Sequence, residues 1–422
     1  MHKRFNDARD WFFEKRFGLF VHWGLYAIPA WHEQILWRTK MKRSEYEKLR
    51  HSFNPTRFDP DRWLDIMEEA GMEYIVFTTK HHDGFCLWNT RYTDYNVMNT
   101  PFGRDVVEML ANACHKRNIP LGFYYSIPDW HHPNYPNQGR HHEMFGPRAT
   151  DCPDREAYLE YVVNQMRELC TNYGEVHLIF WDVNVLGWYD PQVNAMIRSW
   201  QPKAVINDRG PDGGDFGTPE RHVPDGQEFS RPTQACQSLG RESWGYKEDE
   251  DYYTAKYLIQ SIDKVLAMGG SYLLNVGPKA DGSFADMDIA LLRRIGKWYK
   301  SVKEAFTGTV PASHLVVPDE IAKAGSVERA RRDDFLLTRA GNTIYVHLYR
   351  DPQSTAVILK PIDVLPKKAI VLNTGEKLET RVDVTPWHWR EKPWLRVRGL
   401  PVDQFADSVM VLKLEFAPED ID

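Results

Sequence analysis

Short apolar runs alternate with longer amphipathic stretches through the first three quarters of the chain. The apolar runs are rich in β-branched and aromatic residues and predict buried strands. They fall at 17–21, 74–79, 121–125, 176–182, 204–207 and 272–276. The amphipathic stretches predict helices at 59–71, 104–118, 154–173, 195–200, 252–268 and 289–302. Fully apolar strands that alternate with helices are typical of a parallel sheet, and their number and spacing predict a (β/α)8-like barrel.

The pattern changes after Phe306, where Thr307 to Ser313 has the composition of a linker. Short β-rich runs separated by turn signals such as Gly341-Asn342 predict an antiparallel β-sandwich. These runs are 334–339, 343–348, 355–359, 368–372, 395–397 and 408–415. We therefore predict a catalytic barrel over 1–308 and a β-sandwich over 309–422, which packs against the barrel and stabilises it.

The composition limits which partners the protein can be expected to bind and in which compartment it is expected. The net charge of −6 is spread over both signs, so neither nucleic acid nor a membrane surface is an expected partner. No apolar run is long enough to span a bilayer, and the first residues lack a signal peptide. The sequence as it stands predicts a cytoplasmic protein, or a secreted or periplasmic one if a leader has been removed. The 15 Trp suit sugar binding, because indole rings stack on the apolar faces of pyranoses.

Polar side chains follow several predicted strands. In a parallel barrel the carboxyl ends of the strands meet at one face, where active sites are built. The residues expected there are His22, His81, His82, Tyr124 or Tyr125, Asp129, Asp182 and Asp208. Together they predict a polar pocket with an aromatic wall.

A metal centre is a competing interpretation of the clustered histidines. These are His22, His81, His82, His131, His132, His141 and His142. Adjacent histidines on an extended chain point apart, and the sequence has neither His-x-His nor a helical His-x-x-x-His with an intervening Glu. The five Cys are scattered, which argues against a zinc knuckle and a disulfide framework. We therefore expect no metal and no cofactor.

Carboxylate catalysis on a glycosidic bond is the favoured chemistry. It needs one ionised carboxylate and one protonated acid for the leaving oxygen. Asp182, at the end of a predicted strand and beside Trp181, fits the ionised member. The residue pattern leaves Glu33, Glu220, Glu228 and Glu242 open as the acid.

Several motifs together resemble the α-L-fucosidases, family 29 of the glycoside hydrolases. They are Phe17-Gly-Leu-Phe-Val-His22-Trp23-Gly24, Lys80-His81-His82-Asp83-Gly84-Phe85, Tyr124-Tyr125-Ser126, Ser243-Trp244-Gly245-Tyr246 and Asn275-Val-Gly277-Pro278. The resemblance implies a barrel followed by a β-sandwich. It also implies a retaining exo-α-L-fucosidase, which removes terminal α-L-fucose from oligosaccharides or glycoconjugates by double displacement. The expected partner is therefore a fucosylated glycan.

The same resemblance implies roles for individual residues. Asp182 matches the nucleophile, although Val183 stands where the family usually has Gly. Residues that match positions holding the sugar, or that are expected to line its site, are His22, His81, His82, Tyr124, Glu33 or Gln34, Trp37, Trp181 and Trp244.

The acid/base position departs from the family pattern. The family has a Glu shortly before a Cys and the Ser-Trp-Gly-Tyr motif, whereas this chain has Gln234 two residues before Cys236. A Gln side chain cannot exchange a proton at neutral pH. We favour an introduced Glu-to-Gln change that disables the enzyme. The alternatives are an acid elsewhere on the loop, Glu228 or Glu220, or a non-catalytic protein that binds fucosylated glycans.

Overall fold

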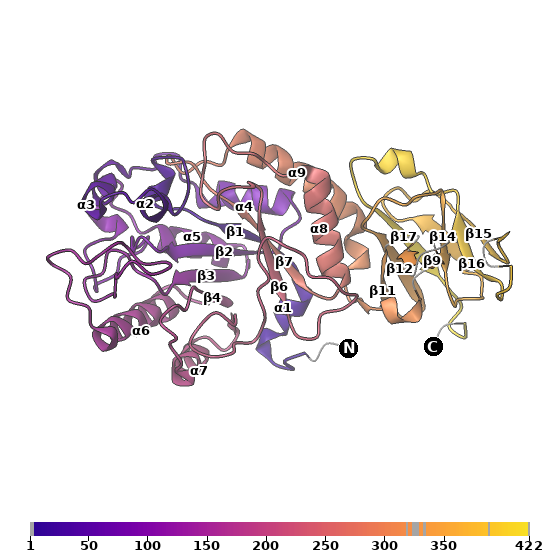
Figure 1. Ribbon diagram of the computed structural model, residues 1–422, viewed down its shortest axis with the longest axis horizontal. Helices are drawn as coiled ribbons and strands as arrows, with labels where there is room; N and C mark the ends of the chain where they lie inside the picture. The colour runs from indigo at the N-terminus through magenta and orange to yellow at the C-terminus, as the bar shows by residue number, and fades with distance from the viewer. Residues whose placement is uncertain (1–3, 318–319, 323–328, 332–334, 387–388, 421–422) are drawn as a thin grey trace.

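The structure is a computed structural model that describes residues 4–317, 320–322, 329–331, 335–386 and 389–420. Seven parallel strands form one curled sheet in the order β5-β4-β3-β2-β1-β7-β6. They are β1 Phe17–Val21, β2 Tyr74–Lys80, β3 Leu121–Ser126, β4 Leu178–Asp182, β5 Val205–Ile206, β6 Gln234–Ser238 and β7 Ser271–Val276. Figure 1 shows this sheet with helices around it. The predicted fold class, a (β/α)8-like barrel followed by a β-sandwich, is confirmed.

The long helices follow the strands as the sequence predicts. They are α4 Pro60–Glu69, α5 Val106–Lys116, α6 Arg155–Asn172, α7 Pro191–Trp200, α8 Ala255–Ala267 and α9 Asp286–Val302. Local sequence explains where they begin: Asp59 accepts hydrogen bonds from the first turn of α4, and Pro60 occupies the first helical position. Three short helices, α1 Trp11–Glu14, α2 Ile35–Arg38 and α3 Arg43–Tyr46, lie in the N-terminal part. No helix among the described residues is long and apolar enough to cross a membrane.

The barrel closes through a segment that is not a regular strand. Residues Phe216 to Glu220 form isolated parallel bridges with Asn207, just after β5, and with Thr233 and Cys236 at β6. The backbone N–H groups of Gln234 and Cys236 donate to carbonyls of this segment. The stretch 210–231, expected to be an extended loop, therefore supplies the missing connection between β5 and β6.

Side chains that alternate along the strands fill the barrel interior. Their apolar cluster contains Phe20, Val76, Tyr124, Leu178, Phe180, Val205, Phe216, Cys236 and Leu273. The ring of Tyr74 lies where a Cβ at Gly18 would be, which explains the glycine in β1. Phe12 of α1 packs on Phe216 at 4.9 Å between ring centroids and helps seal the lower, N-terminal end of the strands.

The C-terminal part contains antiparallel sheets with a core of their own. One sheet has the order β14-β17-β12-β11-β8 and another the order β13-β16-β15, while β9 and β10 form a pair. The strands are β8 Val310–Pro311, β9 Glu320–Ala322, β10 Arg329–Arg331, β11 Leu336–Ala340, β12 Thr343–Leu348, β13 Ala356–Leu359, β14 Lys368–Val371, β15 Glu379–Asp383, β16 Trp394–Arg398 and β17 Met410–Glu415. The start of the predicted run 334–339 lies outside the described residues.

Buried polar contacts join the C-terminal part to helices α8 and α9; α8 lies between the C-terminal sheets and the parallel sheet in Figure 1. Nδ1 of His347 on β12 lies 2.8 Å from Oδ1 of Asp263 on α8, and both side chains are fully buried. Nε2 of the same imidazole lies 2.9 Å from the hydroxyl of Thr338 on β11. The indole N–H of Trp298 on α9 donates to the carbonyl of Val409 at 3.0 Å. These contacts hold the sheets against the outer side of the barrel.

Candidate functional site

A polar pocket opens at the C-terminal ends of the barrel strands. It is lined by Phe20, His22, Glu33, Gln34, His81, His82, Tyr124, His142, Phe180, Asp182, Val183, Arg209, Glu220, Cys236 and Trp244. Most of the residues predicted to hold the sugar are in this set. Residues from distant parts of the chain therefore converge because their strands are parallel and end at one face.

Asp182, the last residue of β4, lies at the base of the pocket. Its Oδ2 accepts a 2.6 Å hydrogen bond from the Tyr124 hydroxyl, and its Oδ1 lies 3.0 Å from Nη1 of Arg209. Nε2 of His82 lies 3.9 Å from Oδ2. Burial alone would raise the pKa of this carboxyl, but Arg209 and the hydrogen bond from Tyr124 outweigh burial and hold the pKa below its usual range. Asp182 is therefore ionised at neutral pH.

A second carboxylate, Glu220, reaches the same arginine from the bridging segment. Its Oε2 lies 2.9 Å from Nη1 of Arg209, the nitrogen that also contacts Asp182. The Glu220 side chain is 40% exposed, whereas that of Asp182 is 13% exposed. One carboxylate thus lies deep in the pocket and the other at its mouth, with one guanidinium between them.

Two of the lining histidines have a fixed orientation and a free ring nitrogen. Nδ1 of His22 lies 2.7 Å from Oδ1 of Asn275, whose amide nitrogen donates elsewhere. Nδ1 of His82 lies 2.6 Å from the hydroxyl of Ser126, which itself donates to the carbonyl of Pro128. In both cases Nδ1 is the donor, and this assignment leaves Nε2 as an acceptor for a ligand hydroxyl.

Burial keeps the imidazoles of the pocket neutral. It lowers the pKa of His22 to about 4 and that of His82 to about 3, and it holds the pKa of His81 well below its usual value. Nδ1 of His81 is buried without a hydrogen-bond partner. A proton on that atom would be unsatisfied, so His81 carries its proton on Nε2. The pocket therefore offers both donors and acceptors without adding positive charge.

Glu33 anchors the aromatic wall of the pocket. Its Oε2 accepts hydrogen bonds from the hydroxyl of Ser243 at 2.9 Å and from the backbone N–H of Trp244 at 2.8 Å. Burial opposes ionisation, but His32, His22 and these donors keep the pKa of Glu33 below its usual value. The Trp244 ring lies 5.3 Å from His22 and under the guanidinium of Arg221. This carboxylate therefore fixes the Ser-Trp-Gly stretch beside the pocket.

Val183 follows the buried carboxylate in a strained conformation. Its φ is 57°, in the left-handed region where a β-branched residue is an outlier. A glycine would adopt this conformation without strain. This explains physically why the resemblance leads us to expect Gly at this position. Val183 also lines the pocket. Its backbone strain is thus stored directly beside Asp182.

Gln234, the expected acid/base position, does not reach the pocket, and this geometric prediction was wrong. It is the first residue of β6, pairs with Ser271 at the start of β7, and is fully buried. Its amide nitrogen donates to the Tyr74 hydroxyl at 2.9 Å. Cys236, two residues further along the same face, does line the pocket. Gln234 therefore lies in the lowest layer of the barrel interior, at the end opposite Asp182.

Two of the other candidate acids also lie elsewhere. Glu228 is exposed and precedes Phe229, whose N–H donates to the carbonyl of Met268 just before β7 begins. That position is at the lower end of the barrel. Glu242 is exposed, pairs with Lys247 and does not line the pocket. Of the candidates weighed from the sequence, Glu220 and Glu33 are the ones at the pocket.

Two predicted tryptophan contacts are corrected. Trp181 is fully buried and points away from the pocket, where its indole N–H donates to Asn194 at 3.1 Å. This follows from strand alternation, which sends the side chain before Asp182 to the opposite face. Trp37 does not line the pocket itself but stacks behind His142, with ring centroids 5.6 Å apart.

Three residues expected at this face support it from outside. Asp129 is buried, pairs with Lys80 at 3.1 Å and accepts from backbone N–H groups that follow it. The Tyr125 hydroxyl donates to Gln165 on α6. Asp208 accepts from Thr218 and contacts Arg231. None of the three lines the pocket.

Sequence reasoning missed Arg209 and His142 as pocket residues. Arg209 follows the short strand β5 and contacts Glu220 from the bridging segment 216–220. No hydrophobic pattern in the sequence predicts the path of that segment. His142 was noted only as part of a possible metal cluster. Within the ranges that the structure describes, no group of three or more His, Cys, Asp or Glu side chains is arranged to hold a metal ion.

The sequence profile of the α-L-fucosidases matches residues 2–304. The rat tissue α-L-fucosidase is 30% identical over 337 residues, which cover 71% of this chain and 70% of the relative.

Solved structures extend the similarity to both parts of the chain. The α-L-fucosidase isoenzyme 1 of Paenibacillus thiaminolyticus is 32% identical, with a TM-score of 0.83 over 97% of this chain and 100% of that one. A family 29 α-L-fucosidase from Bacteroides thetaiotaomicron was solved as a trapped covalent intermediate with 2-fluoro-fucosyl fluoride, in a Glu-to-Gln mutant. It is 29% identical, with a TM-score of 0.79 over 98% of this chain and 97% of that one. With this match to the profile over most of its length, the chain belongs to the α-L-fucosidase family of glycoside hydrolases.

Proposed function

We propose that this protein is a retaining exo-α-L-fucosidase that removes terminal α-L-fucose from oligosaccharides or glycoconjugates. The observation that carries the proposal is the pair of carboxylates on one guanidinium. Because Asp182 and Glu220 both contact Nη1 of Arg209, their nearest oxygens lie within about 6 Å of each other. That spacing suits a retaining glycosidase, whose carboxyl groups are roughly 5–5.5 Å apart, better than the roughly 6.5–9.5 Å of an inverting one.

In the first step Asp182 attacks the anomeric carbon as the glycosidic bond breaks, and Glu220, which must enter this step in its protonated form, gives its proton to the leaving oxygen. Asp182 suits the nucleophile because it is deep, ionised and held by Tyr124 and Arg209. The Tyr124 hydroxyl stays protonated because burial raises its pKa well above the usual value. It therefore continues to donate as charge moves off Asp182 onto the new covalent bond.

In the second step water hydrolyses the fucosyl-enzyme. Once Asp182 is esterified, Arg209 has Glu220 as its remaining carboxylate partner in the pocket. Glu220 then accepts a proton from water at the pocket mouth, where its partly exposed side chain lies. Asp182 leaves as a carboxylate, and fucose departs with its original anomeric configuration.

Recognition of the sugar falls to three neutral imidazoles, one ionised carboxylate and an aromatic ring. Nε2 of His22 and Nε2 of His82 accept from hydroxyls, whereas His81 donates. Ionised Glu33 accepts in the same pocket, and Trp244 supplies an aromatic face. A compact pocket with such groups on several sides fits one terminal monosaccharide.

A non-catalytic glycan-binding protein was the alternative drawn from the sequence. It rested on Gln234 as a disabled acid. Because Gln234 lies outside the pocket and Glu220 lies inside it, the observation that prompted this alternative no longer supports it.

The test is hydrolysis of a fucosylated oligosaccharide by the unmodified protein, followed by proton NMR. We expect α-L-fucose as the first-formed anomer, before mutarotation sets in. Release of β-L-fucose first would contradict the retaining mechanism, and binding without release would favour the glycan-binding alternative.

A further inference from the structure

The segment between β3 and α6, Ile127 to Asp154, brings one more imidazole into the pocket. His142 lines the cavity together with the groups described above. His142 lies outside the motifs on which the resemblance to the family rests. It belongs to the segment that connects β3 to α6 rather than to the end of a strand. Its position therefore depends on how this segment is held.

The backbone at His142 is strained and fixed. Its φ is 59°, which is uncommon for a residue other than glycine. Its carbonyl accepts a hydrogen bond from the Trp130 indole N–H at 2.9 Å and one from the Tyr135 hydroxyl at 3.4 Å. Both donors are buried. Such a conformation persists only where its surroundings determine it, and such strain clusters at binding sites.

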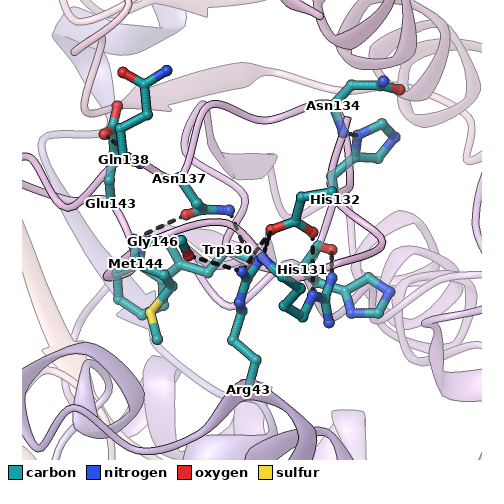
Figure 2. A network of polar contacts seen from close by, with 12 residues as sticks. Arg43, Trp130, His131, His132, Asn134, Asn137, Gln138, Glu143, Met144 and Gly146 are labelled. Atoms are coloured by element: carbon teal, nitrogen blue, oxygen red, sulfur yellow. Dashed lines mark hydrogen bonds and ion pairs between the residues drawn. The ribbon is translucent and has the colours of Figure 1, made fainter. Parts of the chain in front are cut away.

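A polar network holds the rest of the segment, as Figure 2 shows. Arg43 donates to the carbonyls of Trp130 at 3.1 Å and Gly146 at 3.3 Å. Asn137 accepts from the N–H of Met144 at 2.9 Å and donates to the carbonyl of Trp130 at 3.4 Å. The two sides of the segment are thereby tied together around His142.

Packing sets the plane of the ring. The imidazole of His142 stacks on Trp37, with centroids 5.6 Å apart and planes inclined by 11°. Its ring centroid lies 5.2 Å from that of His82, with the two planes inclined by 67°. Trp37 is itself fixed, because its indole N–H donates to the carbonyl of Glu143 at 2.9 Å. The ring is therefore held in place without a hydrogen bond of its own among the described residues.

The hydrogen bonds that His142 lacks define its tautomer. Nδ1 is buried with no partner, as in His81. A proton on Nδ1 would be an unsatisfied buried donor, so the proton resides on Nε2. Burial lowers the pKa of His142 to about 4, which keeps the ring neutral. His142 thus resembles His81, a residue that matches a family sugar-binding position.

We propose that His142 is a further substrate-binding residue, whose Nε2–H donates a hydrogen bond to a hydroxyl of the monosaccharide held in the pocket. The inference rests on the proposed fucosidase function and adds a specificity contact supplied by the β3–α6 segment.

The experiment compares His142→Phe with the wild type on 4-nitrophenyl α-L-fucoside. Phe keeps a planar ring to stack on Trp37 but removes the donor. We expect kcat/KM to fall by about tenfold, the size of one lost neutral hydrogen bond to a substrate. The matched control is His141→Phe, because His141 is exposed and packs edge-on against the same tryptophan without lining the pocket. It should change kcat/KM by less than about twofold.

Deoxy substrates identify the contact. The 2-, 3- and 4-deoxy derivatives of the same aryl fucoside each lack one hydroxyl. If Nε2–H binds one of these hydroxyls, the effect of His142→Phe should disappear on that derivative and persist on the other two. An equal effect on all three would overturn the contact. An effect confined to substrates with a sugar leaving group would overturn it too, because His142 would then bind the leaving group.

A second variant guards against misfolding of His142→Phe, and the wild type separates failure of this inference from failure of the proposed function. His142→Asn suits the left-handed backbone but is too short to reach the same hydroxyl. Thermal unfolding by circular dichroism identifies whichever variant remains folded. If the folded variant retains full kcat/KM, the inference fails while the proposed function stands. If the wild type neither hydrolyses the fucoside nor binds L-fucose, the proposed function itself fails.

Discussion

The two ends of the barrel interior both contain buried polar side chains, yet they differ in what surrounds them. Asp182, at the upper end, contacts Tyr124 and Arg209 and opens into a cavity. Gln234, at the lower end, contacts Tyr74, and its Oε1 is buried without a partner. One end is built to hold a charge, and the other is sealed.

The difference shows that the surroundings of an inward-facing polar residue depend on how far along the barrel axis it lies. Gln234 and Cys236 share a face of β6, but only Cys236 reaches the pocket. The bridging segment shows the same contrast, since Glu220 reaches the upper end while Glu228 lies near the lower one. Pairs of similar residues at the two ends therefore provide matched experiments.

The largest effect is expected from the carboxylate at the upper end. Replacing Asp182 with Ala removes the nucleophile, and kcat/KM for an aryl fucoside should fall by roughly 10⁴-fold or more. Asp208→Asn is the control, because Asp208 also follows a strand but lies outside the pocket. Steady-state kinetics should show less than about a threefold loss for this control. Similar losses in both variants would refute the distinction.

Glu220→Gln should have the next largest effect, and the effect should depend on the leaving group. Hydrolysis of a fucosylated oligosaccharide should fall by roughly 10²–10⁴-fold, because the leaving sugar needs a proton. An aryl fucoside should still fucosylate Asp182, with slow deglycosylation that azide accelerates. Glu228→Gln, from the same connection at the lower end, serves as the control. Loss of activity in that variant instead would identify Glu228 as the acid.

Arg209→Met tests whether Arg209 keeps the Asp182 carboxyl ionised. Without the guanidinium, burial would dominate and the pKa of Asp182 would rise. A protonated Asp182 cannot attack, so the acidic limb of the kcat/KM profile should move to higher pH. At the optimum, kcat/KM should also fall by roughly 10–100-fold. An acidic limb at the same pH as in the wild type would show that Arg209 does not control this carboxyl.

Gln234→Glu should affect stability rather than activity. A carboxylate in the sealed layer beside Tyr74 would be desolvated, so its pKa in the folded state would rise above the unfolded value. The folded state should therefore lose about 2–4 kcal/mol above that pKa and recover as the pH falls and the group becomes neutral. Urea unfolding at two pH values measures this, with the exposed Gln227→Glu as control. A gain in hydrolysis would restore Gln234 as the acid/base position.

The sequence predicted the fold from patterns that burial imposes directly. Apolar strands such as Leu121–Ser126 and capped helices such as Pro60–Glu69 lie close to where periodicity placed them. Strand β6, Gln-Ala-Cys-Gln-Ser, was missed because polar residues interrupt it and give no hydrophobic run. Without that strand, Gln234 was taken for a loop residue near the pocket.

The sequence predicted those site residues whose positions are set by the ends of strands. His22, His81, His82, Tyr124 and Asp182 converge as expected because parallel strands end together. Arg209, Glu220 and His142 depend on connections, whose paths are set by tertiary hydrogen bonds rather than by periodicity. The choice between Glu220 and Glu228 stayed open in the sequence for the same reason.

The most direct test of this account is to find which side chain becomes fucosylated. The unmodified protein is incubated with 2-fluoro-fucosyl fluoride, and intact mass spectrometry followed by peptide mapping locates the adduct. We predict one fucosyl group per chain, attached to Asp182 on the peptide that contains Phe180-Trp181-Asp182. Labelling of any other residue, or no labelling of a folded protein that hydrolyses fucosides, would contradict the account.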